Sequence, residues 1–248
     1  MSRPTLLMIH GLVGSLDYFR PASRTTGARV HTCDLLGYGA RRDAPLKELT
    51  ISAQADHVAG VISGIGAGPV WLLAHSMGGA VAVLVADRFP QLVAGMINVE
   101  GNFTLKDAFW SAKIADLEPE AWEKRYRDML GDVAKWVEQC GVAATPQRVE
   151  WMRGILINQP AKTVYVMSEA ILRETGPREY LSAVRRIIKK GLSIHLLAGE
   201  RSAPAWDVPD FVRDSASSYT EQSGVGHLLM LEDPDAFCGI VDSILKKA

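Results

Sequence analysis

Short apolar runs alternate with longer segments of helical period along most of this 248-residue chain. A short apolar run bounded by Gly, Asp or Pro is typical of a buried strand, and a helix between two runs returns the chain to start a parallel neighbour. The alternation predicts an α/β fold with a mostly parallel sheet of about six strands flanked by helices. We expect strands at residues 5–9, 28–33, 70–74, 94–99, 192–198 and 217–222, and helices at 51–65, 77–89, 211–215 and 234–246.

The interval 102–191 breaks this alternation, because it holds helical segments punctuated by prolines and no convincing strand. We therefore predict a core domain formed by residues 1–101 and 192–248, with residues 102–191 inserted as a helical cap. Charged residues surround the tryptophans here at spacings that suit amphipathic helices, so the rings either pack the cap onto the core or line an apolar pocket. Four of the six tryptophans fall in this interval: Trp110, Trp122, Trp136 and Trp151.

A serine stands between the expected strand 70–74 and the helix that follows, in the segment AHSMGG (residues 74–79). Small residues two before and two after Ser76 allow a tight turn that lifts its hydroxyl clear of the sheet. The start of the next helix directs unpaired N–H groups at the same place. Ser76 is therefore a candidate nucleophile; the alternative is a glycine-rich turn with an ordinary serine.

This turn and three other segments resemble the motifs of the α/β-hydrolase superfamily, in the family's order. The turn resembles the nucleophile elbow, and residues 10–12 (HGL), after the first strand, are similar to the His-Gly oxyanion turn. Residues 34–39 (DLLGYG) resemble the Asp-x-x-Gly-x-Gly loop, and residues 226–234 resemble the segment that carries the catalytic histidine.

The resemblance assigns roles to particular residues. It implies that His227 takes the proton of the Ser76 hydroxyl, and that the backbone N–H groups of Leu12 and Met77 form the oxyanion hole. His10 is expected to shape the oxyanion turn. Family members usually have a strand hairpin ahead of the His-Gly strand, but only four residues precede that strand here. We therefore expect the first two strands of the family sheet to be missing.

The carboxylate that completes a triad has more than one candidate. Many relatives carry an aspartate three residues after the glycine that ends the strand corresponding to 192–198, but Ser202 occupies that position here. Asp207 or Glu200 are the local substitutes. Glu100 ends the strand that follows the nucleophile strand, where some haloalkane dehalogenases and lactone hydrolases carry their acid. An idle charge after so apolar a strand is unfavourable, so we expect Glu100 to be the acid, with Asp207 as the alternative.

The resemblance implies a serine hydrolase that cleaves a carboxylic ester, thioester or lactone through an acyl-enzyme on Ser76, without a dissociable cofactor. Serine as nucleophile argues against dehalogenase and epoxide hydrolase chemistry, which uses an aspartate. A compact cap rich in tryptophan favours a small to medium, mainly apolar substrate. The candidate pocket walls, chosen by position and apolarity, are His10, Phe103, Phe109, Trp110, Ile114, Trp151 and Met152.

Two other functions stay open. One is a carbon–carbon or elimination lyase resembling the menaquinone-pathway synthase, which uses the same triad on a polyanionic substrate but has an aspartate where Ser202 stands. A cap lined with arginines would favour it, and five are available: Arg125, Arg127, Arg148, Arg153 and Arg173. The other is a ligand receptor that keeps the hydrolase fold with little turnover.

Composition excludes several classes of protein. With 48% hydrophobic and 22% charged residues and a net charge of −1, the chain matches a folded globular protein without the net basic charge typical of nucleic-acid binding, although this leaves a local basic patch open. No apolar stretch approaches the roughly 18 residues of a membrane span. Three widely spaced cysteines, with no signal-peptide pattern, favour a cytoplasmic protein. We expect no metal site, no membrane or nucleic-acid partner, and a monomer or homodimer acting on a small molecule.

Overall fold

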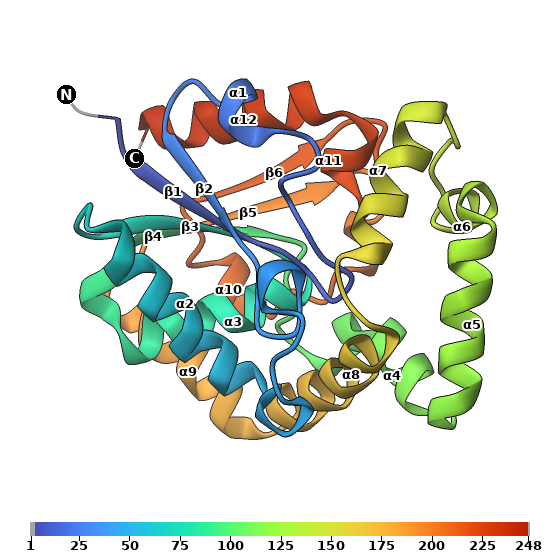
Figure 1. Ribbon diagram of the computed structural model, residues 1–248. Coiled ribbons are helices and arrows are strands. Elements are labelled where there is room, and N and C mark those ends of the chain that lie inside the picture. The colour runs from blue at the N-terminus through green and yellow to red at the C-terminus, as the bar shows by residue number, and fades with distance from the viewer. Residues whose placement is uncertain (1–2, 248) are drawn as a thin grey trace.

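A six-stranded parallel sheet forms the centre of the computed structural model, which describes residues 3–247 (Figure 1). The spatial order of the strands is β2-β1-β3-β4-β5-β6, and every pairing is parallel. This confirms the predicted α/β fold and the count of six strands. The strands are β1 (Thr5–Ile9), β2 (Arg29–Cys33), β3 (Val70–His75), β4 (Val93–Val99), β5 (Ile194–Gly199) and β6 (Ser218–Gln222).

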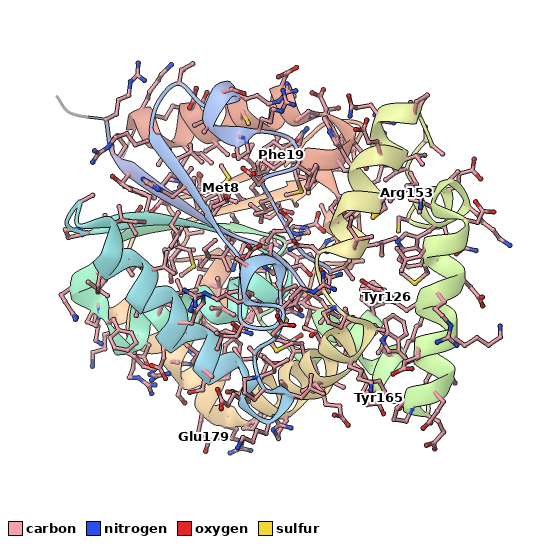
Figure 2. All side chains as sticks on the ribbon, viewed as in Figure 1. Met8, Phe19, Tyr126, Arg153, Tyr165 and Glu179 are labelled. Atoms are coloured by element: carbon pink, nitrogen blue, oxygen red, sulfur yellow. The ribbon has the colours of Figure 1, made fainter. Side chains whose placement is uncertain are left out.

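Alternate residues of the central strands supply two separate hydrophobic cores, because successive strand side chains point to opposite faces of a sheet. Leu7 and Ile9 of β1 join the core on one face. Leu6 and Met8 join the core on the other, where Phe19 also lies (Figure 2). Both faces are thus buried, which explains why these strands appear in the sequence as continuous apolar runs.

Helices cover both faces of the sheet (Figure 1). On one side lie α2 (Ile51–Ile65), α3 (Met77–Arg88) and α9 (Arg178–Lys189); on the other lie α1 (Pro21–Arg24) and α12 (Pro234–Lys247). Two further short helices are α10 (Asp210–Arg213) and α11 (Leu229–Glu232). Sequence patterns missed α1 and α11, because four residues are too few to show a helical period.

One strand begins later than the sequence predicts, at Ile194 rather than at residue 192. Leu192 instead completes the end of α9, where its N–H donates to Ile187 O (3.2 Å) and the N–H of Gly191 donates to Ile188 O (2.9 Å). These two bonds form a Schellman motif, and Gly191 supplies the positive φ of 80° that the motif requires. Leu192, which apolarity alone assigns to β5, therefore belongs to the cap of α9.

The interval 102–191 is helical throughout, with prolines at the helix starts. Pro119 and Pro146 occupy the first turn of their helices, and Pro160 and Pro177 immediately precede theirs, as expected for a residue that lacks an N–H. Besides α9, the helices are α4 (Phe109–Ala115), α5 (Pro119–Gly131), α6 (Val133–Gln139), α7 (Pro146–Ile157) and α8 (Ala161–Thr175).

These helices do not all pack in the same way. α9 packs against α3 of the core, and α8 contacts both α2 and α4. By contrast, α5, α6 and α7 lie to one side of the molecule, beyond the ends to which the β5 and β6 arrows point (Figure 1). The carboxyl ends of all the parallel strands therefore face these three helices. Within residues 3–247, none of the helices combines the length and apolarity needed to cross a membrane.

Asp242 on α12 holds the loop that leads into β2. Its carboxylate accepts the N–H groups of Thr26 (2.9 Å) and Gly27 (2.8 Å) and the Thr26 hydroxyl (2.7 Å). Burial acts to raise the pKa of Asp242, but these hydrogen bonds outweigh it and hold the pKa below its usual value. The charged form is therefore the one that stabilises the fold.

We predict that Asp242→Ala lowers the free energy of unfolding at pH 7 by about 2 kcal/mol, because two partly buried N–H groups and a hydroxyl lose a charged acceptor. A carboxyl with a depressed pKa stabilises above its unfolded pKa and loses this effect as pH falls through its folded pKa. The difference from wild type should therefore shrink below about pH 4. Urea denaturation at pH 7 and pH 3 measures both effects.

The matched control for this prediction is Asp235→Ala on the same helix. Asp235 pairs with Arg24 at the surface and is 78% exposed, so its loss should change the stability by at most about 0.5 kcal/mol. Equal effects of the two substitutions, or a difference for Asp242 that does not change with pH, would contradict the assignment.

Candidate active site

Ser76 occupies the sharp turn between β3 and α3 with an unusual backbone conformation, φ 54° and ψ −126°. The strand and helix leave this turn little room, because a Cβ at residue 78 would lie 2.6 Å from His10 O and one at residue 79 would lie 2.6 Å from the Gly101 Cα. Only glycine fits at these two positions. The close approach brings the residue 10 turn and the end of β4 against the base of the Ser76 turn.

Hydrogen bonds on both sides hold Ser76 in this conformation. Its N–H donates to Val99 O at 3.1 Å, at the end of the neighbouring strand β4. Its carbonyl accepts the N–H groups of Gly79 (2.9 Å) and Asn102 (3.1 Å). Strained residues of this kind persist where the surrounding structure fixes them.

His227 lies beside this turn, in the loop between β6 and α11. The Nε2–H of His75, the residue before Ser76, donates to the His227 carbonyl at 2.9 Å, and the two rings have centroids 4.7 Å apart. The N–H of Gly226 donates to Glu232 Oε1 at 2.7 Å. The His227 side chain is 45% exposed. The loop is thus anchored on both sides of the histidine, and the imidazole remains open to solvent.

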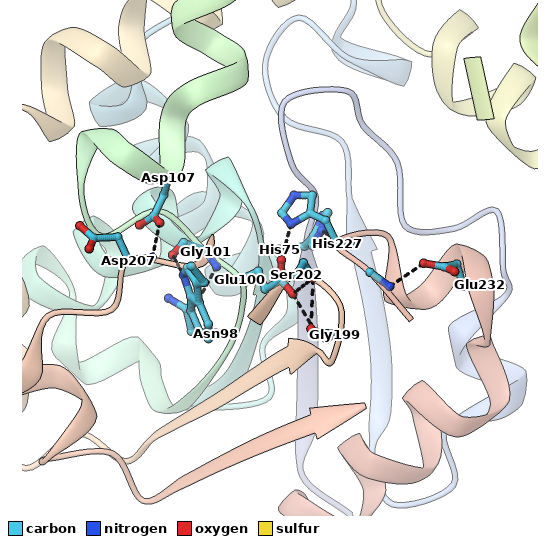
Figure 3. Close-up of polar contacts among 12 residues, drawn as sticks. His75, Asn98, Glu100, Gly101, Asp107, Gly199, Ser202, Asp207, His227 and Glu232 are labelled. Carbon is cyan, nitrogen blue, oxygen red and sulfur yellow. Dashed lines mark hydrogen bonds and ion pairs between the residues drawn. The ribbon is translucent and has the colours of Figure 1, made fainter. Parts of the chain in front are cut away.

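Glu100 connects His227 to the sheet (Figure 3). Its Oε2 lies 2.6 Å from His227 Nδ1, and its Oε1 accepts the N–H of Gly199 (2.7 Å) and the hydroxyl of Ser202 (2.5 Å). Burial acts to raise the pKa of Glu100, but the bonds from His227, Ser202 and Gly199 hold it below its usual value. Glu100 is thus a buried carboxylate whose two oxygens both have donors.

The other two candidate acids bind elsewhere. Asp207 accepts the hydroxyl of Thr104 at 2.7 Å and pairs with Lys106 at 3.2 Å, and Figure 3 shows it beside Asp107, away from His227. Glu200 accepts the N–H of Gly224 at 2.6 Å and the hydroxyl of Ser223 at 2.8 Å. Of the three carboxylates, Glu100 is the one in hydrogen-bond contact with His227.

The turn after β1 lies on the other side of Ser76. A Cβ at residue 11 would lie 3.0 Å from the Ser76 Cβ. His10 is buried, accepts the N–H of Leu35 at Nε2 (3.2 Å) and donates from Nδ1 to Gly11 O (2.8 Å). Burial lowers its pKa to about 4, so the ring is neutral and fixed in one tautomer at neutral pH.

The backbone of Leu12 completes this turn. The hydroxyl of buried Tyr38 donates to Leu12 O at 2.8 Å. Among residues 3–247, the Leu12 N–H donates to no backbone carbonyl. Met77, the first residue of α3, likewise belongs to a helix end whose N–H groups are free of helical partners. The two backbone groups expected to bind an oxyanion thus come from the turn after β1 and the start of α3.

A family model described as "Alpha/beta hydrolase family" matches residues 6–240. This match covers nearly the whole chain and includes every segment described above. The chain belongs to the alpha/beta hydrolase family. The expected resemblance is therefore confirmed.

Two curated relatives of this α/β hydrolase are ester-cleaving enzymes by name. A pimeloyl-acyl-carrier-protein methyl ester esterase of Sodalis glossinidius (strain morsitans) is 31% identical over 187 residues, which is 71% of this chain and 69% of that protein. An sn-1-specific diacylglycerol lipase of Mus musculus is 31% identical over 101 residues, 39% of this chain and 32% of the relative.

Solved structures share the fold. A carboxylesterase structure from the ammonia-oxidizing Thaumarchaeon Nitrososphaera gargenis has a TM-score of 0.75 at 16% identity, covering 99% of this chain and 92% of that one. MenH from S. aureus has a TM-score of 0.74 at 17% identity, covering 100% and 95% of the two chains. At these identities the likeness concerns the fold of this α/β hydrolase.

The expected pocket walls of the α/β hydrolase occupy different environments. Phe103, Ile114 and Met152 are buried, as His10 is. Trp110 and Trp151 are half-buried. Phe109 is 62% exposed, with Lys113 Nζ 5.8 Å from its ring centroid.

The tryptophans of residues 102–191 pack largely against other aromatic rings. The Trp110 ring lies 6.2 Å from that of Trp122 and 5.7 Å from that of Trp136. Trp151 packs 5.6 Å from Tyr18, which belongs to the loop between β1 and α1. These contacts place Trp151 at the boundary between α7 and the core.

Sequence patterns predict no role for two residues near the site, Ser202 and His75. Ser202 drew attention as a departure from the family pattern, and it proves to donate to Glu100. His75 stands next to the nucleophile position, where no sequence pattern indicates a task. Burial and the neighbouring charge of His227 lower the pKa of His75 to about 3. It is therefore a neutral donor to the His227 carbonyl at physiological pH.

We predict that Ser202→Ala raises the pKa of the Glu100 carboxyl, because the carboxylate loses one of its donors while its burial is unchanged. Titration of the side-chain carboxyl by ¹³C NMR measures the shift. Ser182→Ala is the control, since the exposed Ser182 hydroxyl donates to Arg178 O within α9. An unchanged Glu100 pKa in a folded Ser202 variant would contradict this role.

Proposed function

We propose that this protein is a serine hydrolase that cleaves carboxylic esters, with Ser76 as nucleophile, His227 as general base and Glu100 as the acid of the triad. The main support is the 2.6 Å contact between Glu100 Oε2 and His227 Nδ1. This contact directs the opposite nitrogen, Nε2, away from the buried carboxylate. It joins the histidine loop to the end of β4, the same strand end that accepts the Ser76 N–H.

The proposed reaction proceeds in two halves. Ser76 Oγ attacks the ester carbonyl carbon while its proton passes to His227 Nε2, and the carbonyl oxygen becomes an oxyanion that the Leu12 and Met77 N–H groups stabilise. The imidazolium then protonates the leaving alcohol, which leaves an acyl-enzyme. Water attacks the acyl carbon with His227 again as base, and the acid is released. Glu100 keeps Nδ1 protonated and stabilises the imidazolium throughout.

We propose an acyl ester, thioester or lactone of small to medium size and mainly apolar character as the substrate. The names of the two curated relatives, a methyl ester esterase and a diacylglycerol lipase, support an ester of an acyl chain. In this proposal α4–α8 form the cap over the strand ends, and the half-buried rings of Trp110 and Trp151 contact the acyl chain. His10 shapes the oxyanion turn without contacting the reacting carbonyl.

The cap arginines do not favour a polyanionic lyase substrate. Arg148 donates to the carbonyls of Ala143 (3.2 Å) and Glu232 (2.6 Å). Arg153 donates to Leu130 O at 3.3 Å. Arg127 and Arg173 lie near carboxylates of their own helices. Two of these guanidinium groups, those of Arg148 and Arg153, already have backbone acceptors, and Arg125 is exposed on α5. The arginines therefore do not form a common anion site, which supports ester hydrolysis over the lyase.

We predict that the purified protein turns over a series of p-nitrophenyl esters many times per molecule, and that Ser76→Ala lowers kcat by at least about a thousandfold. Release of p-nitrophenol, followed by its absorbance, measures the rate for each acyl length. Ser243→Ala on α12, whose hydroxyl donates to Gly239 O, should retain wild-type activity. Equal turnover by the wild type and the Ser76 variant would reject the nucleophile.

We predict that Glu100→Gln lowers kcat by about 10³- to 10⁴-fold. The donors Gly199 and Ser202 would hold the amide oxygen and leave its NH₂ group facing Nδ1, and a neutral amide does not stabilise the imidazolium. Steady-state kinetics on the best ester measure the loss. Asp207→Asn is the matched control and should stay within about twofold, since Asp207 contacts Thr104 and Lys106. The reverse order of the two effects would assign the acid to Asp207.

A further inference from the structure

We propose that Asn158 and Gln159, at the junction of α7 and α8, position the turn that supplies the Leu12 oxyanion donor. The cap would then hold part of the catalytic machinery as well as contact the substrate. This inference rests on the proposed function, because it concerns the oxyanion hole of the same reaction. It assigns Asn158 and Gln159 a positioning role, since neither contacts Ser76 or His227.

The two residues bind both backbone polar groups of one residue in the turn, Gly14. Asn158 Nδ2–H donates to Gly14 O at 2.5 Å, and the Gly14 N–H donates to Gln159 Oε1 at 3.3 Å. Residue 14 also lies directly on the His10 ring, because a Cβ there would approach Nδ1 to 1.9 Å. Gly14 therefore packs on the buried histidine on one side while the cap takes its hydrogen bonds on the other.

The orientation of the Gln159 amide is set from the cap. Gln159 is 2% exposed, and its Nε2–H donates to the Tyr126 hydroxyl at 2.5 Å. The Tyr126 hydroxyl in turn donates to Leu156 O at 2.7 Å. Tyr126 projects from α5 towards the interior (Figure 2). With its NH₂ group fixed on Tyr126, the amide must present its oxygen to Gly14.

Asn158 extends the same connection to a second core loop. Its carbonyl accepts the Gly39 N–H at 2.7 Å, and its Nδ2–H also lies 3.3 Å from Asp34 Oδ1. The residue after Asp34, Leu35, donates its N–H to His10 Nε2. The two loops that surround His10 are thus held by one residue of the α7–α8 junction.

These contacts restrict the backbone of Leu12. This residue lies between His10, which is locked by its ring hydrogen bonds, and Gly14, which is locked by the cap, and its own carbonyl is held by Tyr38. The peptide that carries the Leu12 N–H also has its carbonyl, Gly11 O, bound by His10 Nδ1, so the N–H has little freedom to rotate. An oxyanion donor is effective when it is already oriented before charge develops. Loosening Gly14 should therefore lower kcat, with little change in KM.

The test compares Asn158→Ala and Gln159→Met in the full-length protein with Gln147→Met, an exposed glutamine of α7 that bonds to Glu150. Three readouts are used: ester kinetics, inhibition by an alkyl trifluoromethyl ketone, and hydrogen exchange of the amides of residues 10–16. Ser76 Oγ adds to the carbonyl carbon of the ketone while the serine proton passes to His227. The anionic hemiketal formed therefore depends on the oxyanion hole.

We expect both variants to lower kcat about tenfold to a hundredfold with KM within twofold. The ketone should bind more weakly by a similar factor, the amides of residues 10–16 should exchange faster, and Gln147→Met should match wild type. Tyr126→Phe removes the hydroxyl that holds the Gln159 amide and donates to Leu156 O but leaves both cap side chains in place, so it should give a smaller effect in the same direction. It serves as the test should either other variant fail to fold.

Two results would overturn the proposal. One is unchanged amide exchange at residues 10–16 in folded variants. The other is a raised KM with kcat and ketone inhibition unchanged, which would identify these residues as pocket walls. Hydrogen exchange is independent of turnover. It therefore reports on how Asn158 and Gln159 hold the turn even if the wild-type protein hydrolyses no ester. Absence of Ser76-dependent turnover in the wild type would reject the proposed function instead.

Discussion

The carboxylate of Glu100 joins three parts of the molecule at the carboxyl edge of the sheet. It extends from the end of β4, accepts the Gly199 N–H at the end of β5, and contacts His227 in the loop after β6. A buried charge is costly unless it is paired and hydrogen-bonded, and here both oxygens have donors. The positive φ of 43° at Glu100 and that of 54° at Ser76 are strained conformations, of the order of 1 to 3 kcal/mol each, which these contacts maintain.

Much of the fold could be predicted from the sequence, because the pattern of a doubly covered parallel sheet is local. Each buried strand is apolar along its length, and each helix after it has its own period, so neighbouring contacts suffice to recognise them. The Ser76 turn was predictable for the same reason, since its small residues are adjacent in the chain. The predicted start of β5 was wrong because a helix cap, which apolarity does not reveal, takes Leu192: its N–H closes α9 instead of joining β5.

The rest of the site depends on convergence in space, which no local pattern records. Glu100, Glu200 and Asp207 all follow strands whose ends meet at one edge, so sequence left three carboxylates available. The structure separates them by their donors: backbone and hydroxyl groups of nearby turns bind Glu200, and Thr104 and Lys106 bind Asp207. Apolarity was an equally incomplete guide to the pocket, because an apolar helical residue can be buried like Met152 or exposed like Phe109.

In the proposed function, Asn158 and Gln159 let a cap influence the chemistry without contacting the reacting atoms. Two polar residues before a proline are typical of a loop, and their partners lie 144 and 145 residues away in the chain. Yet one is buried, and together they bind both polar groups of Gly14, so displacing the α7–α8 junction must either carry the turn with it or leave the Gly14 N–H unpaired. In the proposed mechanism the cap and the oxyanion turn are thus mechanically one unit, so a movement of the cap that admits substrate has to preserve this junction or re-form it before the carbonyl is attacked.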